Sequence, residues 1–404
     1  MSKITFLLSQ SLDSPSGLGR YGPLAKELVK LGHKVEIIAL HPTFEDLSTK
    51  EFEQDGFRLH YVAQMHVRKT GDIKSYYPTT QLLKITFLAT WQLSKSVLAG
   101  KSEIIFVGKP HPMNSIAGLL GKVINRSKLI LDCDDFEAAS GRFGSGWQRS
   151  IVTWFEKWMP HQATFVTTNT KFMLNKLINW GIDENKIVYV PNGIDKDRFS
   201  PPDHQELDSL REDMSLNARK VVLFVGSLSL PSHPVGLLLG AFKNLIDQGE
   251  KIVLILVGGG EDLQNLIDQV TKLGLTQHVN FCGRVPPEKV PLYYSLADVS
   301  TDPVNDDDAA RGRAPLKLFE SWASGVPFVC GDVGDRRYLL GDPPAGVLVQ
   351  PGDQDAFAKG IYSIISNPEL AGELRQRGIE RIASFTWDQL ARSLDEQISV
   401  RIPN

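Results

Sequence analysis

Cysteine is scarce in this sequence of 404 residues, which holds only Cys133, Cys282 and Cys330. An odd and scattered set excludes a disulfide framework and a cysteine zinc site, and it favours a reducing compartment. No apolar run reaches the roughly 18 residues that a membrane-spanning helix needs. Residues 4–8 are strand-like, and no basic segment precedes them, so we expect no secretory signal peptide. These absences predict a soluble cytoplasmic protein, or at most a peripheral protein on the inner face of the membrane.

Charge of one sign is not in excess over the whole chain, since 44 Lys and Arg stand against 47 Asp and Glu. Residues 60–130 differ, because ten basic residues there face only two acids, Asp72 and Glu103. Such a stretch attracts anionic lipids, phosphates or nucleic acid, although it equally fits the solvated face of one domain. No nucleic-acid recognition module accompanies it, so we expect no nucleic acid as a partner.

An internal repeat indicates the architecture. Residues 2–40 correspond to residues 219–257 at a constant offset of 217. Each copy has an apolar strand, a loop, a helix closed by glycine and a second apolar strand, which is typical of a parallel sheet covered on both faces. The sequence therefore predicts an α/β chain with two Rossmann-like, doubly wound domains that face each other across a cleft. We expect them at 1–198 and 199–385, with the polar stretch 196–216 as linker and hinge.

The loops that follow the strands should carry the chemistry, because ligands of open parallel sheets bind beyond the carboxyl ends of the strands. The first such loop contains Gly17, Gly19 and Arg20. Glycines let the backbone approach a ligand, and the helix that follows offers free N–H groups to an anion. Residues 38–42 after the second strand lack an acidic residue to hold a ribose, which argues against a nicotinamide dehydrogenase.

A series of motifs runs through most of the chain, and it is strongest from 186 to 335. The tracts are Val190-Pro191-Asn192-Gly193, then residues 223–228, 255–260, 279–285 and 293–299, then Pro315 to Pro327 and finally Phe385-Thr386-Trp387. Their content and order resemble the family 4 glycosyltransferases. The resemblance implies the GT-B fold, a UDP- or GDP-sugar donor, retention of anomeric configuration, and no metal or other cofactor. It also implies that the first domain serves the acceptor and the second the donor, with residues 386–404 returning as a helix to the first.

The donor motif is a Pro-x-Lys-x-x-Glu variant that places Lys317 and Glu320 on one face of a helix. Lysine at a helix start suits a phosphate, and the carboxylate can accept both ribose hydroxyls. The alternative is an exposed ion pair on an ordinary helix. Positions that match the family motifs or line the same loops complete the expected donor site: Gly17, Gly19, Arg20, Asn192, Gly193, Ser227, His233, Gly258, Arg284, Val285, Asp308, Arg313, Pro315 and Leu316.

The sequence departs from the usual family pattern in two places. Gly312 stands where a second glutamate is common, and the acids at 306–308 either serve the sugar in its place or form a solvated loop. The Arg and Lys that usually follow the first strand of the donor domain are missing. The diphosphate charge must then fall to Lys317, with Arg284, Arg311 and Arg313 as other candidates and His233 as a helper.

Asp134 and Asp135 follow an apolar strand in the first domain and are the acceptor-side catalytic candidates. A carboxylate there can take a proton from an acceptor hydroxyl or support a positive sugar centre, unless these acids simply cap the next helix. Basic residues alternate with aromatic ones from 66 to 101, and Trp147, Trp154 and Trp158 form a second aromatic group. This composition favours an enzyme on an anionic membrane with a lipid or lipid-linked acceptor, unless the aromatics belong to the core.

Two other functions remain open at this stage. Another GT-B enzyme, such as a nucleotide-sugar epimerase, would need catalytic groups that the sequence does not identify. A non-catalytic sugar-nucleotide-binding protein is consistent with the missing glutamate and the missing basic pair.

Overall fold

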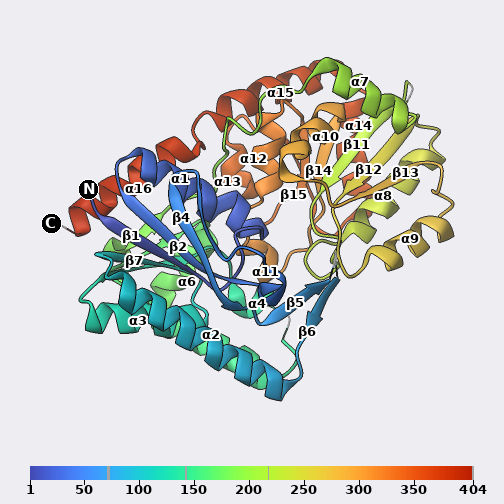
Figure 1. The fold of residues 1–404 in the computed structure, drawn as a ribbon. Coiled ribbons are helices and arrows are strands. Elements are labelled where there is room, and N and C mark those ends of the chain that lie inside the picture. Colours follow the sequence, from blue (N-terminus) through green and yellow to red (C-terminus); the bar gives the residue numbers. More distant parts are fainter. Residues whose placement is uncertain (71–72, 142, 217, 403–404) are drawn as a thin grey trace. The chain divides into compact units, whose positions relative to one another are not determined.

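A computed structural model describes residues 1–70, 73–141, 143–216 and 218–402 (Figure 1). The chain divides into two compact units. Unit 1 comprises residues 1–193, 312–314 and 387–404, and unit 2 comprises residues 194–311 and 315–386. The division follows residue 193, compared with the boundary expected after 198. Among the described residues, no helix combines the length and the apolar content that crossing a bilayer requires.

Unit 1 is built on an eight-stranded sheet in the order β10-β9-β8-β7-β1-β2-β4-β3. Every pair is parallel except β3 with β4. The central strands are almost wholly buried, which explains their continuous apolar sequences. The strands are β1 (Lys3–Leu8), β2 (Lys34–His41), β3 (Glu51–Gln54), β4 (Phe57–Gln64), β7 (Ile104–Gly108), β8 (Lys128–Cys133), β9 (Phe165–Thr168) and β10 (Ile187–Tyr189), beside a separate antiparallel pair of β5 (Val67–Thr70) and β6 (Ile73–Tyr76).

Helices cover both faces of this sheet. One face packs against α1 (Gly22–Lys30) and α16 (Trp387–Arg401), so the last helix of the chain belongs to the core of unit 1. The other face packs against α2 (Thr79–Gly100), α3 (Pro112–Ile124), α5 (Gly146–Gln162) and α6 (Lys171–Asn179). Short turns complete the unit: a π-helical turn (Gly17–Tyr21), 3-10 turns at Phe44–Asp46 and Glu184–Lys186, and α4 (Glu137–Ser140).

Unit 2 has a six-stranded, fully parallel sheet in the order β13-β12-β11-β14-β15-β16. This is the 3-2-1-4-5-6 order of the Rossmann fold, and its topological switch point lies between β11 and β14. The strands are β11 (Lys220–Val225), β12 (Ile252–Val257), β13 (Val279–Gly283), β14 (Val299–Asp302), β15 (Phe328–Gly331) and β16 (Val347–Val349). The helices are α7 (His204–Asp213), α8 (Val235–Asp247), α9 (Leu263–Lys272), α10 (Val290–Leu296) after a 3-10 turn (Pro287–Lys289), α11 (Asp308–Arg311), α12 (Leu316–Ala323), α13 (Arg336–Leu340), α14 (Gln354–Ile365) and α15 (Pro368–Ile382).

The internal repeat marks equivalent elements of the two sheets. The residue bounds of β1 and β11 differ by the same offset of 217. Each strand is followed by a helix and then by a strand that pairs with it in parallel. Gly32 and Gly249 end the two helices with φ of 94° and 90°, a left-handed conformation that strongly favours glycine. The prediction of two Rossmann-like α/β domains is confirmed.

The expected linker over residues 196–216 is wrong, because this stretch lies within unit 2. Its charged sequence hides apolar residues at helical spacing, and Leu207, Leu210 and Met214 pack against the core of unit 2. Phe199 and Leu216 are themselves buried in that core. The polar composition of residues 196–216 therefore did not indicate a linker, because their few apolar side chains pack in the core of unit 2.

Candidate active site

The first group of candidate residues lies at the switch point of the unit 2 sheet. Lys317, in the first turn of α12, places its Nζ 3.0 Å from Oδ1 of Asp302, the last residue of β14. The same ammonium lies 3.4 Å from Nδ1 of His233 and 5.1 Å from the ring centre of Phe224 in β11. Lys317 is only 8% exposed. A cation at the positive end of a helix is unfavourable alone, so Asp302 stabilises it and a bound anion would do the same.

Asp302 is shared between two cations. Arg336 donates from Nε and Nη2 to Oδ2 of Asp302, at 3.1 and 2.7 Å, while Lys317 contacts the other oxygen. Burial alone would raise the pKa of Asp302, but Lys317 and Arg336 outweigh it and hold that pKa well below its usual range. These three charged groups carry a formal excess of one positive charge, which suits a phosphate at the strand ends.

Glu320 lies one turn after Lys317 and has different partners. Arg198 Nη2 donates to Oε1 at 3.2 Å, and the hydroxyl of Tyr294 donates to Oε2 at 3.2 Å. Burial raises the pKa of Glu320 although Arg198 and Tyr294 oppose it. The alternative of an ordinary exposed ion pair with Lys317 is wrong, since Lys317 is buried and each side chain contacts other groups.

Glycine backbone lies beside the Lys317 side chain. Gly226 follows β11, and a Cβ at this position would lie 3.1 Å from Cε of Lys317. Gly258 follows β12 with φ of 139°, and a Cβ there would lie 1.9 Å from the carbonyl oxygen of Gly226. The residues that follow β11 and β12 therefore pack closely beside Lys317, and only glycine fits at Gly258 without a shift of the backbone.

The other expected donor residues of unit 2 occupy loops at the same edge of the sheet. Ser227 and His233 follow β11, and the exposed Arg284 follows β13 together with Val285. Pro315 and Leu316 form the start of α12. Asp308 opens α11 and pairs with Arg311 at 3.4 Å, while Asp306 pairs with Arg311 at 2.8 Å. Arg311 is thus matched by acids of its own loop, which weakens it as a phosphate ligand. Arg313 groups with unit 1.

A second group of residues lies in unit 1, where the switch point falls between β1 and β7. Nζ of Lys109, directly after β7, contacts Asp134 Oδ1 at 3.1 Å, Asp135 Oδ2 at 2.7 Å and Glu137 Oε1 at 2.7 Å. His111 continues the network, with Nε2 3.0 Å from Glu137 and Nδ1 2.7 Å from the hydroxyl of Ser9 after β1. Lys109 is therefore buried among acids, and it does not contribute to a basic surface over residues 60–130 as its sequence position suggested.

Asp134 has the properties of a proton acceptor. Burial, opposed by Lys109 and reinforced by Asp135 and Asp132, raises the pKa of Asp134 to about 7. Its Oδ1 atom is buried and has no hydrogen-bond partner among the described residues, despite the nearby ammonium. Three other buried side-chain atoms without such partners lie in loops or turns after strands of the same sheet: Gln10 Nε2, Tyr21 Oη and Asn169 Oδ1. Unsatisfied polar atoms at this edge are positioned to meet a polar ligand.

The alternative that Asp134 or Asp135 caps the next helix is wrong. The first helical N–H groups of α4, on Glu137 and Ala138, donate to Glu156 of α5 at 2.7 and 3.3 Å. Burial, reinforced by Glu137, raises the pKa of Glu156 to about 8. Asp134 and Asp135 therefore remain available at the edge of the sheet.

The carboxylate oxygens of Asp134, Asp135 and Glu137 lie within 4.8 Å of one another, a spacing that a divalent cation could use. The ammonium of Lys109 already contacts all three groups. Burial alone would lower the pKa of Lys109, but the three acids outweigh it and raise that pKa well above its usual value. The chain thus supplies its own cation to these carboxylates.

Arg20 does not offer a free charge to a ligand, in contrast to the expectation from its loop. Its Nε and Nη2 donate to the two oxygens of Asp132, both at 2.7 Å, and Nη1 donates to Val190 O and Asn192 Oδ1. Arg20 is 1% exposed, and these hydrogen bonds tie the turn after β1 to the end of β8 and to the loop after β10. Gly17 is structural as well, because a Cβ there would lie 2.3 Å from the carbonyl oxygen of Leu12. Gly19 lies in the same π-helical turn, and Gly193 ends the main segment of unit 1.

Several residues of both networks were not identified from the sequence. Lys109, His111 and Asp302 follow or end strands, so the rule that identified Asp134 could also have identified them. Arg198, Arg336 and Tyr294 lie in a loop and two helices, and no sequence pattern linked them to the carboxylates that they contact.

Comparisons with known proteins agree with this organisation. The model of "Glycosyl transferase 4-like domain" matches residues 16–193, and the model of "Glycosyl transferases group 1" matches residues 209–381. A GDP-mannose-dependent alpha-(1-6)-phosphatidylinositol monomannoside mannosyltransferase of Mycolicibacterium smegmatis is 24% identical over 80% of this chain and 83% of its own length. A D-inositol 3-phosphate glycosyltransferase of Nocardia farcinica is 27% identical, over 61% of this chain and only 55% of its own length.

Solved structures share the fold over nearly the whole chain. A sucrose-phosphate synthase from Thermosynechococcus elongatus superposes with a TM-score of 0.78 at 17% identity and covers 99% of both chains. HepE of Anabaena, in complex with UDP and glucose, gives a TM-score of 0.77 at 17% identity and covers 99% of this chain and 100% of its own.

Proposed function

This chain belongs to the family 4 glycosyltransferases of the GT-B fold, and we propose that it transfers a sugar from a nucleotide-diphosphate donor to an acceptor hydroxyl with retention of configuration. The observation that carries the proposal is the buried cluster of Lys317, Asp302 and Arg336 beside the bare backbone of Gly226 and Gly258. It places a positive excess at the switch point, where nucleotides bind in this topology.

Each side chain has a role in the proposed reaction. Lys317 binds and neutralises the diphosphate as it leaves, and this stabilises the charge that develops on it. Glu320, held by Arg198 and Tyr294, accepts the ribose hydroxyls. The proposed reaction is metal-independent, because Lys317 and Arg336 supply the positive charge beside the diphosphate. In unit 1, Asp134 accepts the acceptor proton or supports the positive sugar centre, with Asp135 as the alternate. The donor phosphate assists this deprotonation of the acceptor hydroxyl. The acceptor oxygen then attacks the sugar directly, so no covalent glycosyl-enzyme is needed.

The donor and acceptor classes follow from the relatives as proposals. UDP and GDP are the favoured bases, since HepE was solved with UDP and the mycobacterial relative is GDP-mannose-dependent. The acceptor that we propose is a lipid or lipid-linked glycan, because that relative acts on a phosphatidylinositol mannoside.

A thermal-shift screen of UDP, GDP, ADP and their sugar conjugates tests the donor site. A nucleotide present at about 100 Kd should stabilise the wild type by roughly 2.7 kcal/mol. Lys317→Ala and Glu320→Ala should each lose most of this shift, because each removes a charged ligand contact worth about 1.5–3 kcal/mol. Lys272→Ala, an exposed lysine at the end of α9, is the matched control and should respond like the wild type. A wild type that no nucleotide stabilises would contradict the proposal.

A further inference from the structure

Three adjacent helices of unit 1 carry most of the exposed apolar side chains. Helix α3 contacts both α2 and α5, and all three bury their inner residues against one face of the sheet. Figure 1 shows α2 and α3 lying side by side along that layer. Eleven of the nineteen large apolar side chains exposed among the described residues lie on these helices. Phe87 is 69% exposed, Trp91 62%, Val123 74% and Trp154 53%.

We call the outward side chains of residues 79–100, 112–124 and 146–162 the α2–α3–α5 face. Groups of exposed apolar side chains on a protein surface mark interaction sites. Because Phe87, Trp91 and Trp154 are more than half exposed, these three aromatics are not core residues, whereas Trp158 packs partly against the core.

The charge of the α2–α3–α5 face has one sign. Helices α2 and α3 contain no Asp or Glu at all, and the only acid in α5 is Glu156, which is buried. Lys84, Lys95, Arg149 and Lys157 are exposed on the same helices. Cations without exposed acids are complementary to an anionic surface. A second copy of the chain stacked face to face would instead bring like charges together, which opposes association.

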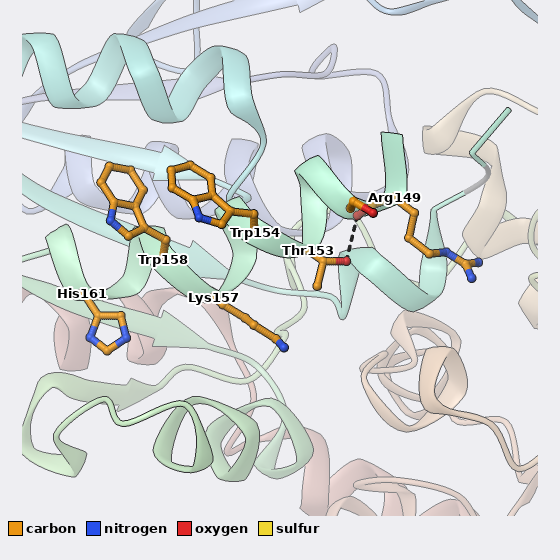
Figure 2. Close-up of a pocket in the computed structure, with 7 residues that line it drawn as sticks. Arg149, Thr153, Trp154, Lys157, Trp158 and His161 are labelled. Carbon is orange, nitrogen blue, oxygen red and sulfur yellow. Dashed lines mark hydrogen bonds between the residues drawn. The ribbon is translucent and has the colours of Figure 1, made fainter. Parts of the chain in front are cut away.

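A stacked pair of tryptophans on α5 is a third observation. The rings of Trp154 and Trp158 stack at 4.8 Å with an interplanar angle of 14°. Together with Arg149, Lys157 and His161 they line an open hollow of about 590 Å³. Figure 2 shows the two indole rings side by side along the helix, with the long Lys157 and Arg149 side chains extending from the same stretch. Indole rings beside cations are typical of segments at the boundary between water and lipid.

We propose that the α2–α3–α5 face docks on an anionic lipid bilayer. Phe87, Trp91 and Trp154 enter the headgroup region, and the lysines and Arg149 pair with lipid phosphates. The inference deepens the proposed function, because it places unit 1 next to a lipid-borne acceptor. Only that link to the acceptor rests on the proposed function, since docking itself requires no glycosyl transfer.

Cosedimentation of the full chain with vesicles tests the proposal. We expect binding to vesicles of phosphatidylglycerol and phosphatidylcholine, and much weaker binding to vesicles of phosphatidylcholine alone. Replacing Lys84, Lys95 and Lys157 by Gln should weaken binding about fivefold for each lysine, the ratio that corresponds to about 1 kcal/mol per cation near the surface. Lys272→Gln, outside the face, should leave binding unchanged.

The apolar part has its own variants. The triple variant Phe87→Ser, Trp91→Ser, Trp154→Ser should bind at least tenfold more weakly than the wild type. The double variant Tyr362→Ser, Ile379→Ser removes exposed apolar residues of unit 2 and should bind like the wild type. Because all these side chains are exposed, the variants should keep the wild-type melting temperature, which also checks that they fold.

Three results would overturn the docking proposal. One is equal binding to charged and neutral vesicles, another is wild-type binding by both face variants, and the third is no binding of the wild type to either vesicle. Light scattering identifies the competing occupant, since a dimer lost in the triple variant would assign the face to a second copy. Nucleotide-dependent stabilisation, measured without vesicles on the same samples, reports separately on the proposed function.

Discussion

At the scale of single residues, Asp134 combines burial, a neighbouring cation and an oxygen without a hydrogen-bond partner among the described residues. Lys109 alone would keep this carboxyl ionised, but burial and the acids at Asp132 and Asp135 raise its pKa to about 7. A carboxylate with a pKa near neutrality is a far better base than an ordinary aspartate, because it binds the transferred proton more strongly.

Replacing Asp134 by Asn should lower kcat about 10²–10⁴-fold if it acts as the base. Its raised pKa sets the sign of the pH dependence: the ionised base is present above about pH 7, so the wild-type rate should fall as pH drops below that value. When rates are measured from pH 5 to 9, the variant should not show this fall in rate below pH 7. Its nucleotide-induced thermal shift should stay unchanged. Unchanged kcat in Asp134→Asn, alongside a reduced kcat in Asp135→Asn, would transfer the role to Asp135.

The residues that sequence analysis identified and those that it missed differ in one physical respect. Asp134, Lys317 and Glu320 carry their signal locally, in a strand end or a short motif. The partners that set their properties come from other parts of the chain: Lys109 is separated from Asp134 by α3 and β8, and Arg198 is 122 residues from Glu320. Such pairings depend on how strands are ordered in the sheet, which a single sequence does not state.

At the scale of elements, the turn after β12 packs on the backbone of Gly226, which lies beside Lys317. Gly258 combines a φ of 139° with a backbone oxygen only 1.9 Å from where a Cβ would lie. Alanine therefore cannot fit unless β11 and β12 separate at their carboxyl ends. The repeat in the sequence predicted these strands well because each is a continuous apolar run, whereas the charged face of α7 concealed its packing in the core.

Gly258→Ala should cost more than 3 kcal/mol in the free energy of unfolding of unit 2, the upper range of a single strained backbone site, and should abolish the nucleotide shift. Gly274→Ala is the matched control, since this glycine also has positive φ, at 70°, but nothing lies within 4 Å of its Cβ position. It should cost only about 1–2 kcal/mol for the left-handed backbone and leave nucleotide binding intact. Urea titration of both variants measures the difference, and equal costs would contradict the steric argument.

At the scale of the whole molecule, each unit has its own cores, yet unit 1 is assembled from three separate segments of the chain. Helix α16 buries Trp387, Ala391, Leu394 and Ile398 in the core that also holds Leu24 and Leu28 of α1. His33 anchors the helix from outside through Asp395, at 2.8 Å. Residues 1–193 therefore do not complete the hydrophobic core of their own unit.

Leu394→Ala should destabilise unit 1 by about 2–5 kcal/mol, because it leaves a cavity in a fully buried position. Val400→Ala on the same helix, at a side chain that is 75% exposed, should change stability by less than about 0.5 kcal/mol. Denaturant unfolding of both variants, followed with and without nucleotide, should locate the loss in unit 1. A Leu394→Ala variant as stable as the wild type would show that α16 does not support this core.

The return of α16 also fixes an order of events on the ribosome. Unit 2 lies almost wholly between residues 194 and 386, so it is synthesised after the main segment of unit 1 and before the helix that completes the core of unit 1. Unit 1 must wait for its last helix, which follows residue 193 by roughly 10–40 s at typical rates of synthesis. During that interval α16 does not yet cover the apolar side of α1, so the core of unit 1 stays incomplete.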